Sequence, residues 1–398
     1  MGGVWLNALT GTHMITLALP GQITPRTHRL AVATWFFLQG LIFASWASRI
    51  PSIQQRMGLS EGDLGLLLLA IPLGQLPSLP VTGWLVHKYG SRRTALAGAM
   101  IYSTALVGLG WAPSLWLLLP CLVLFGFASN LMNISINTQA VGVEALYPKP
   151  IMASFHGMWS LAGFTGAAIG TAMIGWGVMP EYHFLLILAL ILLGAVLSWG
   201  ALLPHARTED ETEQPLFVLP DRTLLSLGAI AFCALICEGA MFDWSGVYFK
   251  KVVHADKAWV GAGYTAFMST MALGRFGADW LTARLGPKAV IQLSGCLTAV
   301  GLLIAVLFPT LGPAMLGFML VGFGTSSVVP LVYSAAGKST VMSAGMALAA
   351  VSTIGFLGFL IGPPIIGMVA GATSLRISYS LIAVMGLCVA AVASRARL

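Results

Sequence analysis

Two acidic residues lie inside one long apolar segment of the sequence. Glu238 and Asp243 are the only charged residues in the run from 223 to 249. Ionisable side chains within the hydrocarbon of a membrane are costly and therefore functional by default. A carboxyl group in such a place is suited to take up a proton on one face and release it on the other. We therefore predict that Glu238 and Asp243 couple protons and that Glu238 also contacts substrate. The structural alternative is a hydrogen bond to a neighbouring helix.

Helical geometry separates these two carboxyl groups. At 100° per residue, positions 238 and 243 differ by about 140° around an ideal helix. Without a break in the helix, Glu238 and Asp243 do not face one cavity together. Glu238 lies nearer the middle of the apolar run.

Amide and imidazole groups occur in two other apolar runs. Asn130, Asn133 and Asn137 are spaced i, i+3 and i+7 in the run 114–139 and form one polar stripe. Such a stripe serves interhelical hydrogen bonds or faces a water-filled cavity. His156 and Trp159 share a face near the start of the run 152–177. His156 titrates near neutral pH in its unperturbed state, although a packed structural histidine is the competing interpretation.

Aromatic residues complete the candidate substrate site. Trp35 and Gln39 come from the run 30–50 and Trp244 from the run 223–249. Flat rings and amides are suited to a cyclic or polyhydroxylated ligand. Tryptophan near a helix end is also a common anchor at the membrane interface. The predicted substrate-binding set is Trp35, Gln39, Asn133, Asn137, His156, Trp159, Glu238 and Trp244.

A possible ion pair lies in the run 258–283. Arg275 and Asp279 are spaced i and i+4, which places them on one face of a helix. We predict a gating ion pair, with direct substrate contact as the alternative. The sequence offers no nucleophile with its base, no phosphate-binding glycine loop and no His or Cys cluster. We expect no enzymatic activity, no metal and no cofactor.

The elements that carry these residues are too apolar for a soluble protein. Of the 398 residues, 58% are hydrophobic and 8% charged, and the mean hydropathy is +0.89. Soluble domains are typically 45–50% apolar. The apolar runs are long and do not alternate, which favours membrane-spanning helices over a barrel. With about 20 residues per span, twelve spans are predicted, near 30–50, 61–86, 94–111, 114–139, 152–177, 182–203, 223–249, 258–283, 289–308, 311–336, 343–370 and 375–394.

One polar segment divides the chain. Residues 204–221 carry five acidic residues and three prolines and are too polar to enter lipid. We predict an N-terminal extension (1–28), a six-helix bundle (29–203), a linker (204–221) and a second six-helix bundle (222–398). The halves repeat each other, because the glycine-rich stretches 163–175 and 355–367 share glycines at equal spacing. Weaker matches pair Gly74 with Gly274 and Gly126 with Gly322. Two parallel repeats around a midplane site are typical of secondary transporters.

The distribution of basic residues predicts the orientation. Of the 20 Lys and Arg residues, thirteen fall on the side of the termini and the linker, and six fall on the other side. Cytoplasmic loops carry the excess of basic residues, so both termini are predicted to be cytoplasmic. The net charge of +7 is explained by this topology rather than by nucleic-acid binding.

The loop after the second span resembles a family motif. The stretch from Gly83 to Arg93 (GWLVHKYGSRR) resembles the G-x-L-a-D-r-x-G-r-k motif of the major facilitator superfamily, with His87 at the acidic position. The stretches 48–51, 155–161 and 238–245 are similar to bacterial inner-membrane carriers of the YbjJ and MosC type. The resemblance spans residues 29–395. It implies gating roles for Gly83, Gly90 and Arg92, and Asp279 of the second half becomes the candidate acidic partner.

The expected protein is an all-α integral membrane protein with twelve helices in two pseudo-symmetric bundles. We expect it to move a small polar organic solute, such as a sugar, polyol or related metabolite, by proton-coupled alternating access across a bacterial inner membrane. Its partners are then substrate, protons and membrane lipid, without nucleic acid, and it acts as a monomer. The alternatives are a drug or metabolite exporter and a solute sensor that does not transport.

Overall fold

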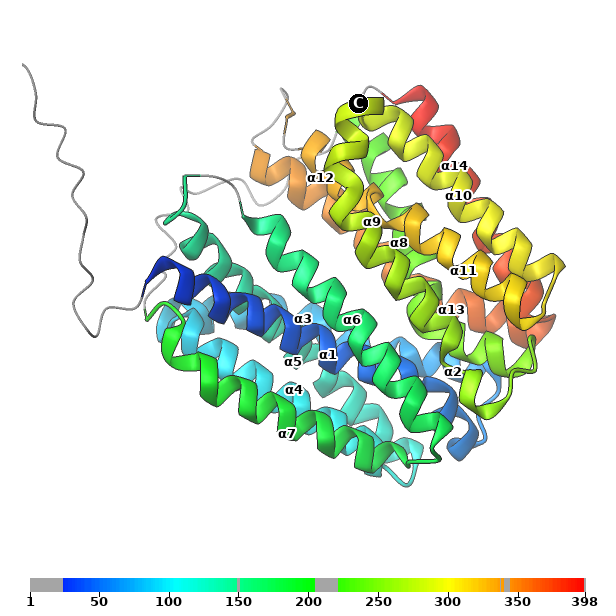
Figure 1. Cartoon of the computed structure of the whole chain (residues 1–398), viewed down its shortest axis with the longest axis horizontal. Coiled ribbons are helices and arrows are strands. Elements are labelled where there is room, and N and C mark those ends of the chain that lie inside the picture. The colour runs from blue at the N-terminus through cyan, green and yellow to red at the C-terminus, as the bar shows by residue number, and fades with distance from the viewer. Residues whose placement is uncertain (1–23, 149–150, 205–220, 337, 340–343, 397–398) are drawn as a thin grey trace, which may run out of the picture.

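The chain folds into two groups of long helices (Figure 1). The computed structural model describes residues 24–148, 151–204, 221–336, 338–339 and 344–396. These residues contain helices and no strands. The first group comprises α1 (Pro25–Met57), α2 (Glu61–Leu68), α3 (Ala70–Tyr89), α4 (Ser91–Trp111), α5 (Leu115–Glu144), α6 (Met152–Gly175) and α7 (Pro180–Ser198). The second comprises α8 (Arg222–Lys251), α9 (Ala262–Leu285), α10 (Pro287–Leu307), α11 (Leu311–Ser326), α12 (Val328–Ala336), α13 (Ala344–Ala372) and α14 (Leu375–Arg395).

The helices are long enough to cross a membrane. Among the described residues, eleven helical spans have the required length and hydropathy. In this count, α2 and the first part of α3 form one span, and α11 and α12 form another. The twelfth predicted span is α9, a helix of 24 residues that carries Arg275 and Arg284. The predicted all-α membrane architecture is therefore confirmed.

Two predicted spans contain a break that the hydropathy pattern did not indicate. The span 61–86 divides between Leu68 and Ala70, and the span 311–336 divides at Ser327. In each case a proline follows four residues after the last residue of the first segment, Pro72 after Leu68 and Pro330 after Ser326. A proline lacks the amide that would bond to the carbonyl four residues earlier, and its ring crowds that carbonyl. The helices therefore break there.

Equivalent glycines pack equivalent helix pairs in the two halves. A Cβ on Gly74 of α3 would collide with the backbone of α5, and one on Gly126 of α5 with the backbone of α3. In the second half, a Cβ on Gly322 of α11 would likewise collide with the backbone of α9, and one on Gly274 of α9 would collide with the Ser326 side chain of α11. Small residues allow helix backbones to pack closely in membranes. The weak sequence matches between the halves thus correspond to equivalent helix–helix contacts, α3 with α5 in the first half and α9 with α11 in the second.

The two bundles touch along α1, α2 and α6 on one side and α8, α9 and α13 on the other. Figure 1 shows α2 beside α13 and α6 facing α9. We call the end that holds Pro25, Pro204 and Arg395 the linker side, and the end that holds Lys251 the far side. The division at 204–221 stays a prediction, because residues 205–220 lie outside the described residues.

Candidate functional site

Arg275 forms one of the polar contacts between the two bundles. Nη1 of Arg275, on α9, donates a 2.6 Å hydrogen bond to Oγ of Ser160 on α6. Its Nη2 lies 3.4 Å from Oε1 of Glu238 on α8. The guanidinium carbon lies 5.7 Å from the ring centroid of Trp159, a cation–π arrangement. We call Trp159, Ser160, Glu238 and Arg275 the bridge cluster.

Aromatic rings surround the bridge cluster. Phe242 lies one helical turn after Glu238 and makes edge contacts with Phe43 at 5.2 Å and with Trp159 at 6.2 Å. Phe43 of α1 also stacks on Trp159 at 6.1 Å. Phe242 further contacts three rings of the second bundle: Tyr264, Phe267 and Phe359. Rings from both bundles therefore meet at this point.

The two carboxyl groups of α8 have different surroundings. Glu238 is 7% exposed and paired with Arg275. Asp243 is 6% exposed, and within the described part of the chain no hydrogen bond or ion pair reaches its carboxyl group. Glu238 thus lies at the contact between the bundles, whereas Asp243 is a buried acid without a polar partner among the described residues.

His156 lies beside the bridge cluster. It is one turn before Ser160, whose hydroxyl donates to the His156 carbonyl at 3.1 Å. Its ring meets Phe36 edge-on at 5.3 Å. Gly157 leaves room for the Phe276 ring, which a Cβ there would approach to 2.9 Å. The structure therefore brings Trp159 together with Glu238 through Arg275 and places His156 one helical turn before Ser160.

The other predicted substrate-binding residues lie elsewhere. Gln39 is buried and donates to the Ser129 carbonyl of α5 at 3.3 Å. Nδ2 of Asn137 donates to Oδ1 of Asn133 at 2.7 Å, an exposed contact within α5. Trp35 and Trp244 are fully buried, and among the described residues no ring contact joins either to Phe242 or Trp159. Their roles in substrate binding remain predictions.

The predicted gating residues lie in two places. Three are on α3, on α4 or in the turn between them (Gly83, Gly90 and Arg92), and two are on α9 (Arg275 and Asp279). Gly90 adopts φ +83° between α3 and α4, and Gly286 adopts φ +78° between α9 and α10, so each half turns at an equivalent glycine. Arg92 stacks on Trp199 at 4.1 Å within the first bundle. Gly83 has open space around its Cα. The side chains of His87 and Asp279 lie outside the described residues, so the Arg275–Asp279 ion pair stays a prediction.

On the far side, polar contacts and close packing join the two bundles. Nζ of Lys251 forms an ion pair with Oε1 of Glu61 at 2.7 Å, and Lys250 donates to Gln55. Between α2 and α13, a Cβ on Gly65 would lie 2.9 Å from the Pro363 carbonyl oxygen. These contacts join α1 and α2 of the first bundle to α8 and α13 of the second.

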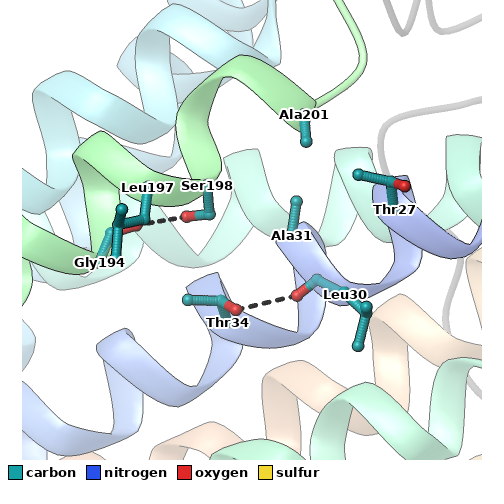
Figure 2. A pocket seen from close by; sticks show the side chains of 8 residues that line it. All are labelled: Thr27, Leu30, Ala31, Thr34, Gly194, Leu197, Ser198 and Ala201. Carbon is teal, nitrogen blue, oxygen red and sulfur yellow. Dashed lines mark hydrogen bonds between the residues drawn. The ribbon is translucent and has the colours of Figure 1, made fainter. Parts of the chain in front are cut away.

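A separate groove lies on the outside of the first bundle (Figure 2). Its volume is about 280 Å³, and α1 and α7 line it on the linker side. Its walls contain three hydroxyl groups, from Thr27, Thr34 and Ser198. Figure 2 shows that Thr34 and Ser198 bond to carbonyls of their own helices. The groove carries no charged side chain and is distant in the fold from the bridge cluster.

Sequence reasoning missed Phe43 and Phe242 as members of the site. Phenylalanines are common in apolar spans, so their type carried no signal. Spacing could have found Phe242, since it follows Glu238 by four residues and shares its face. Arg275 was identified, but its observed partners, Glu238 and Ser160, are distant in the sequence.

Comparisons with known proteins agree with this architecture. The family model described as Major Facilitator Superfamily matches residues 30–276 and 228–397. An uncharacterized MFS-type transporter of Yersinia pestis is 36% identical over 375 residues, covering 94% of this chain and 95% of the relative. The membrane protein MosC of Rhizobium meliloti is 32% identical over 363 residues, covering 90% and 88%.

A solved structure shares the fold. The bacterial homologue of the human lysosomal transporter Spinster, in an inward-facing and unoccupied conformation, matches with a TM-score of 0.72 and 17% identity. The match covers 93% of this chain and 97% of that one.

The chain belongs to the major facilitator superfamily. It is a multi-pass membrane transporter and not an enzyme.

Proposed function

We propose that this transporter moves a small polar organic solute, such as a sugar, polyol or related metabolite, by proton-coupled alternating access. The observation that carries the proposal is Arg275, which bonds to Ser160 across the bundle contact while pairing with Glu238 on its own bundle. A solute that binds at this position contacts both bundles at the same time and can replace the contacts of Arg275. Sites at the interface between repeats are where this architecture binds its cargo.

The aromatic rings define the shape of the proposed solute site. Phe43 and Trp159 come from the first bundle and Phe242 from the second. Flat rings are suited to pack against the apolar face of a cyclic solute, while Arg275, Ser160 and the nearby His156 supply polar contacts. A few convergent polar groups within an apolar lining are typical of small-molecule sites.

Asp243 is the proposed proton site. An unpaired charge at a buried position costs several kcal/mol, and Asp243 has no cation beside it in the described residues. Glu238, in contrast, has Arg275 as a counter-ion. Proton exchange at Asp243 would add or remove a charge inside the second bundle next to its contact with the first. Such a change is a means of coupling protons to rocking of the bundles.

We further propose the cell inner membrane as the location, with both termini cytoplasmic and a monomer as the working unit. The excess of Lys and Arg on the linker side supports this orientation. A fluorescent protein that folds only in the cytoplasm, fused after Leu398, should be bright, and alkaline phosphatase at the same place should be inactive. The reverse pattern would refute the orientation.

A solute screen tests the proposed site. The detergent-purified protein is heated with sugars, polyols, hydroxy acids and amino sugars, because a ligand that binds only the native state raises its apparent stability. A solute that stabilises wild type should lose its effect in Trp159→Ala and Arg275→Gln. Arg284→Gln is the matched control, since Arg284 stacks on Trp280 of its own helix. Equal stabilisation of all four proteins would place the site elsewhere.

Export of lipophilic compounds is the second candidate function. The observation that favours it is the number of rings around Phe242, which include Tyr264, Phe267 and Phe359 beside those of the first bundle. A lipophilic cation could use these rings together with Glu238. Competition by cationic dyes, without competition by sugars and polyols, would favour this function over the first.

A further inference from the structure

We propose that the solute carries a carboxylate, or a planar anion of similar shape, which replaces Glu238 on Arg275. The inference rests on the proposed solute site and specifies its substrate class. In the empty carrier, Glu238 is then a stand-in for the anionic group of the substrate. The geometry of the guanidinium group supports this arrangement.

One edge of the Arg275 guanidinium group has hydrogen-bond donors that are not fully engaged. Its Nη1 is engaged by Ser160 at 2.6 Å, while Nη2 is 3.4 Å from Glu238. A charge-assisted hydrogen bond normally measures about 2.7–2.9 Å, so the contact with Glu238 is long. Nε of Arg275 is buried and has no hydrogen-bond partner among the described residues. Nε and Nη2 form one edge of the guanidinium plane, the edge that accepts a carboxylate through two parallel hydrogen bonds.

The surroundings leave this edge suited to an anion. The guanidinium face is covered by Trp159 at 5.7 Å, so a ligand approaches along the plane rather than from that face. Arginine is the preferred residue for two-point recognition of carboxylates. A carboxylate that bonds to both Nε and Nη2 makes one more hydrogen bond than Glu238 makes. Substrate therefore has an advantage over the internal carboxylate.

Displacement of Glu238 also links solute to protons. Once Arg275 binds the solute, Glu238 is a buried carboxylate without a counter-ion, a state that costs several kcal/mol. A proton taken up by Glu238 removes that charge, so solute binding is accompanied by proton uptake at Glu238, in addition to the proton exchanged at Asp243. The other ionisable groups near this point are His156 of α6, Cys237 and Asp243 on α8 itself, and Tyr264 of α9. Asp279 follows on α9, with its side chain outside the described residues.

Rescue by a small carboxylate tests the inference. Glu238→Ala removes the internal carboxylate and leaves a space next to Arg275. Sodium acetate at constant ionic strength should raise the apparent melting temperature of this variant by roughly 2 to 4 °C, and acetamide, its neutral counterpart of similar shape, should not. Acetate should have little effect on wild type. The effect should disappear in the double variant Glu238→Ala, Arg275→Ala and persist in Glu238→Ala, Arg284→Gln. Glu238→Gln provides a milder variant in case Glu238→Ala does not fold.

Matched acid and neutral solutes test wild type. Gluconate is compared with sorbitol, and galacturonate with galactose, in the same melting experiment. Stabilisation by the acid of a pair and not by its neutral member supports the inference, provided that Arg275→Gln abolishes the difference. Stabilisation by an organic cation instead would overturn it.

The inference and the proposed function fail in different ways. If acetate and acetamide act alike on Glu238→Ala, or if rescue survives without Arg275, the anionic substrate class is wrong. A neutral solute that still requires Trp159 and Arg275 would leave the proposed site intact. Solute binding that ignores all the bridge-cluster variants would refute the site itself.

Discussion

Arg275 and Ser160 form a 2.6 Å hydrogen bond that joins α9 of the second bundle to α6 of the first. The bond is made by one Nη atom of a guanidinium group whose other Nη atom faces Glu238. A rocking motion of the bundles must therefore break or rearrange a contact to a charged group. This makes the bridge cluster a point where solute binding and motion act on the same atoms.

Ser160→Ala should weaken the contact between the bundles. It removes the hydroxyl that accepts from Arg275, and a hydrogen bond to a charged group contributes about 1.5–3 kcal/mol. We expect a lower apparent melting temperature in detergent. Thr165→Val is the control on the same helix, because the Thr165 hydroxyl bonds only to the Leu161 carbonyl among the described residues. Equal melting temperatures for wild type and Ser160→Ala would contradict the bridge.

Gly65→Ala should prevent full closure of the far side. The added Cβ would lie 2.9 Å from the Pro363 carbonyl oxygen and 3.0 Å from the Gly367 Cα. These backbone atoms cannot move without separating α2 from α13. We expect Gly65→Ala to increase the labelling of a Gly62→Cys reporter by a membrane-impermeant maleimide, with the native cysteines replaced by serine.

Gly312→Ala is the control for that experiment. A Cβ added to Gly312 would have no neighbour within 4 Å, and alanine favours helix over glycine by about 1 kcal/mol. This substitution should leave the labelling unchanged. If Gly65→Ala behaves in the same way, the α2–α13 contact does not limit closure.

The Lys251–Glu61 ion pair should contribute little by itself. Its Nζ and Oε1 atoms are 2.7 Å apart, but the side chains are 39% and 24% exposed. Exposed ion pairs typically contribute about 0.2–1 kcal/mol. The charge reversals Glu61→Lys and Lys251→Glu should each lower the melting temperature slightly, and the double variant should recover most of the loss. The coupling should fall at high salt. A double variant with a lower melting temperature than either single variant would show that other contacts determine the stability of this part of the far side.

Gly90→Ala should destabilise the first bundle, whereas Gly83→Ala should not. Gly90 adopts φ +83° and ψ 150°, a backbone conformation that is essentially restricted to glycine and costs other residues on the order of 1–3 kcal/mol. Gly83 lies in the same motif with open space around it. Melting temperatures of the two variants make the comparison. Similar losses of melting temperature in both variants would mean that the motif stabilises the bundle by something other than the turn at Gly90.

Hydropathy and charge in the sequence were sufficient to predict the membrane architecture. Long apolar runs can only be helices in lipid, so the spans were predictable, and the glycine repeats anticipated equivalent contacts in the two halves. The breaks at Leu69 and Ser327 were not predicted, because hydropathy ignores the proline four residues after the first segment ends. The prolines themselves, Pro72 and Pro330, were visible in the sequence.

The candidate site was only partly predictable. Glu238 was recognisable because a charge in an apolar run is exceptional. Its pairing with Arg275 joins residues 37 positions apart, and the contact to Ser160 joins residues 115 positions apart. Spacing along one helix does not report such contacts. Asn137 shows the opposite case, since it bonds to Asn133 of its own helix.

Solute uptake driven by a pH gradient tests proton-coupled transport through the bridge cluster. Proteoliposomes containing wild type, Asp243→Asn, Arg275→Gln or Arg284→Gln are loaded at one pH and diluted into another, with a solute from the stabilisation screen outside. We predict that the gradient accelerates uptake by wild type and Arg284→Gln. Asp243→Asn should exchange solute and respond less to the gradient than wild type, because Glu238 can still exchange a proton, and Arg275→Gln should do neither. Gradient-driven uptake that is unchanged in both Asp243→Asn and Arg275→Gln would contradict the proposed coupling and the proposed site together.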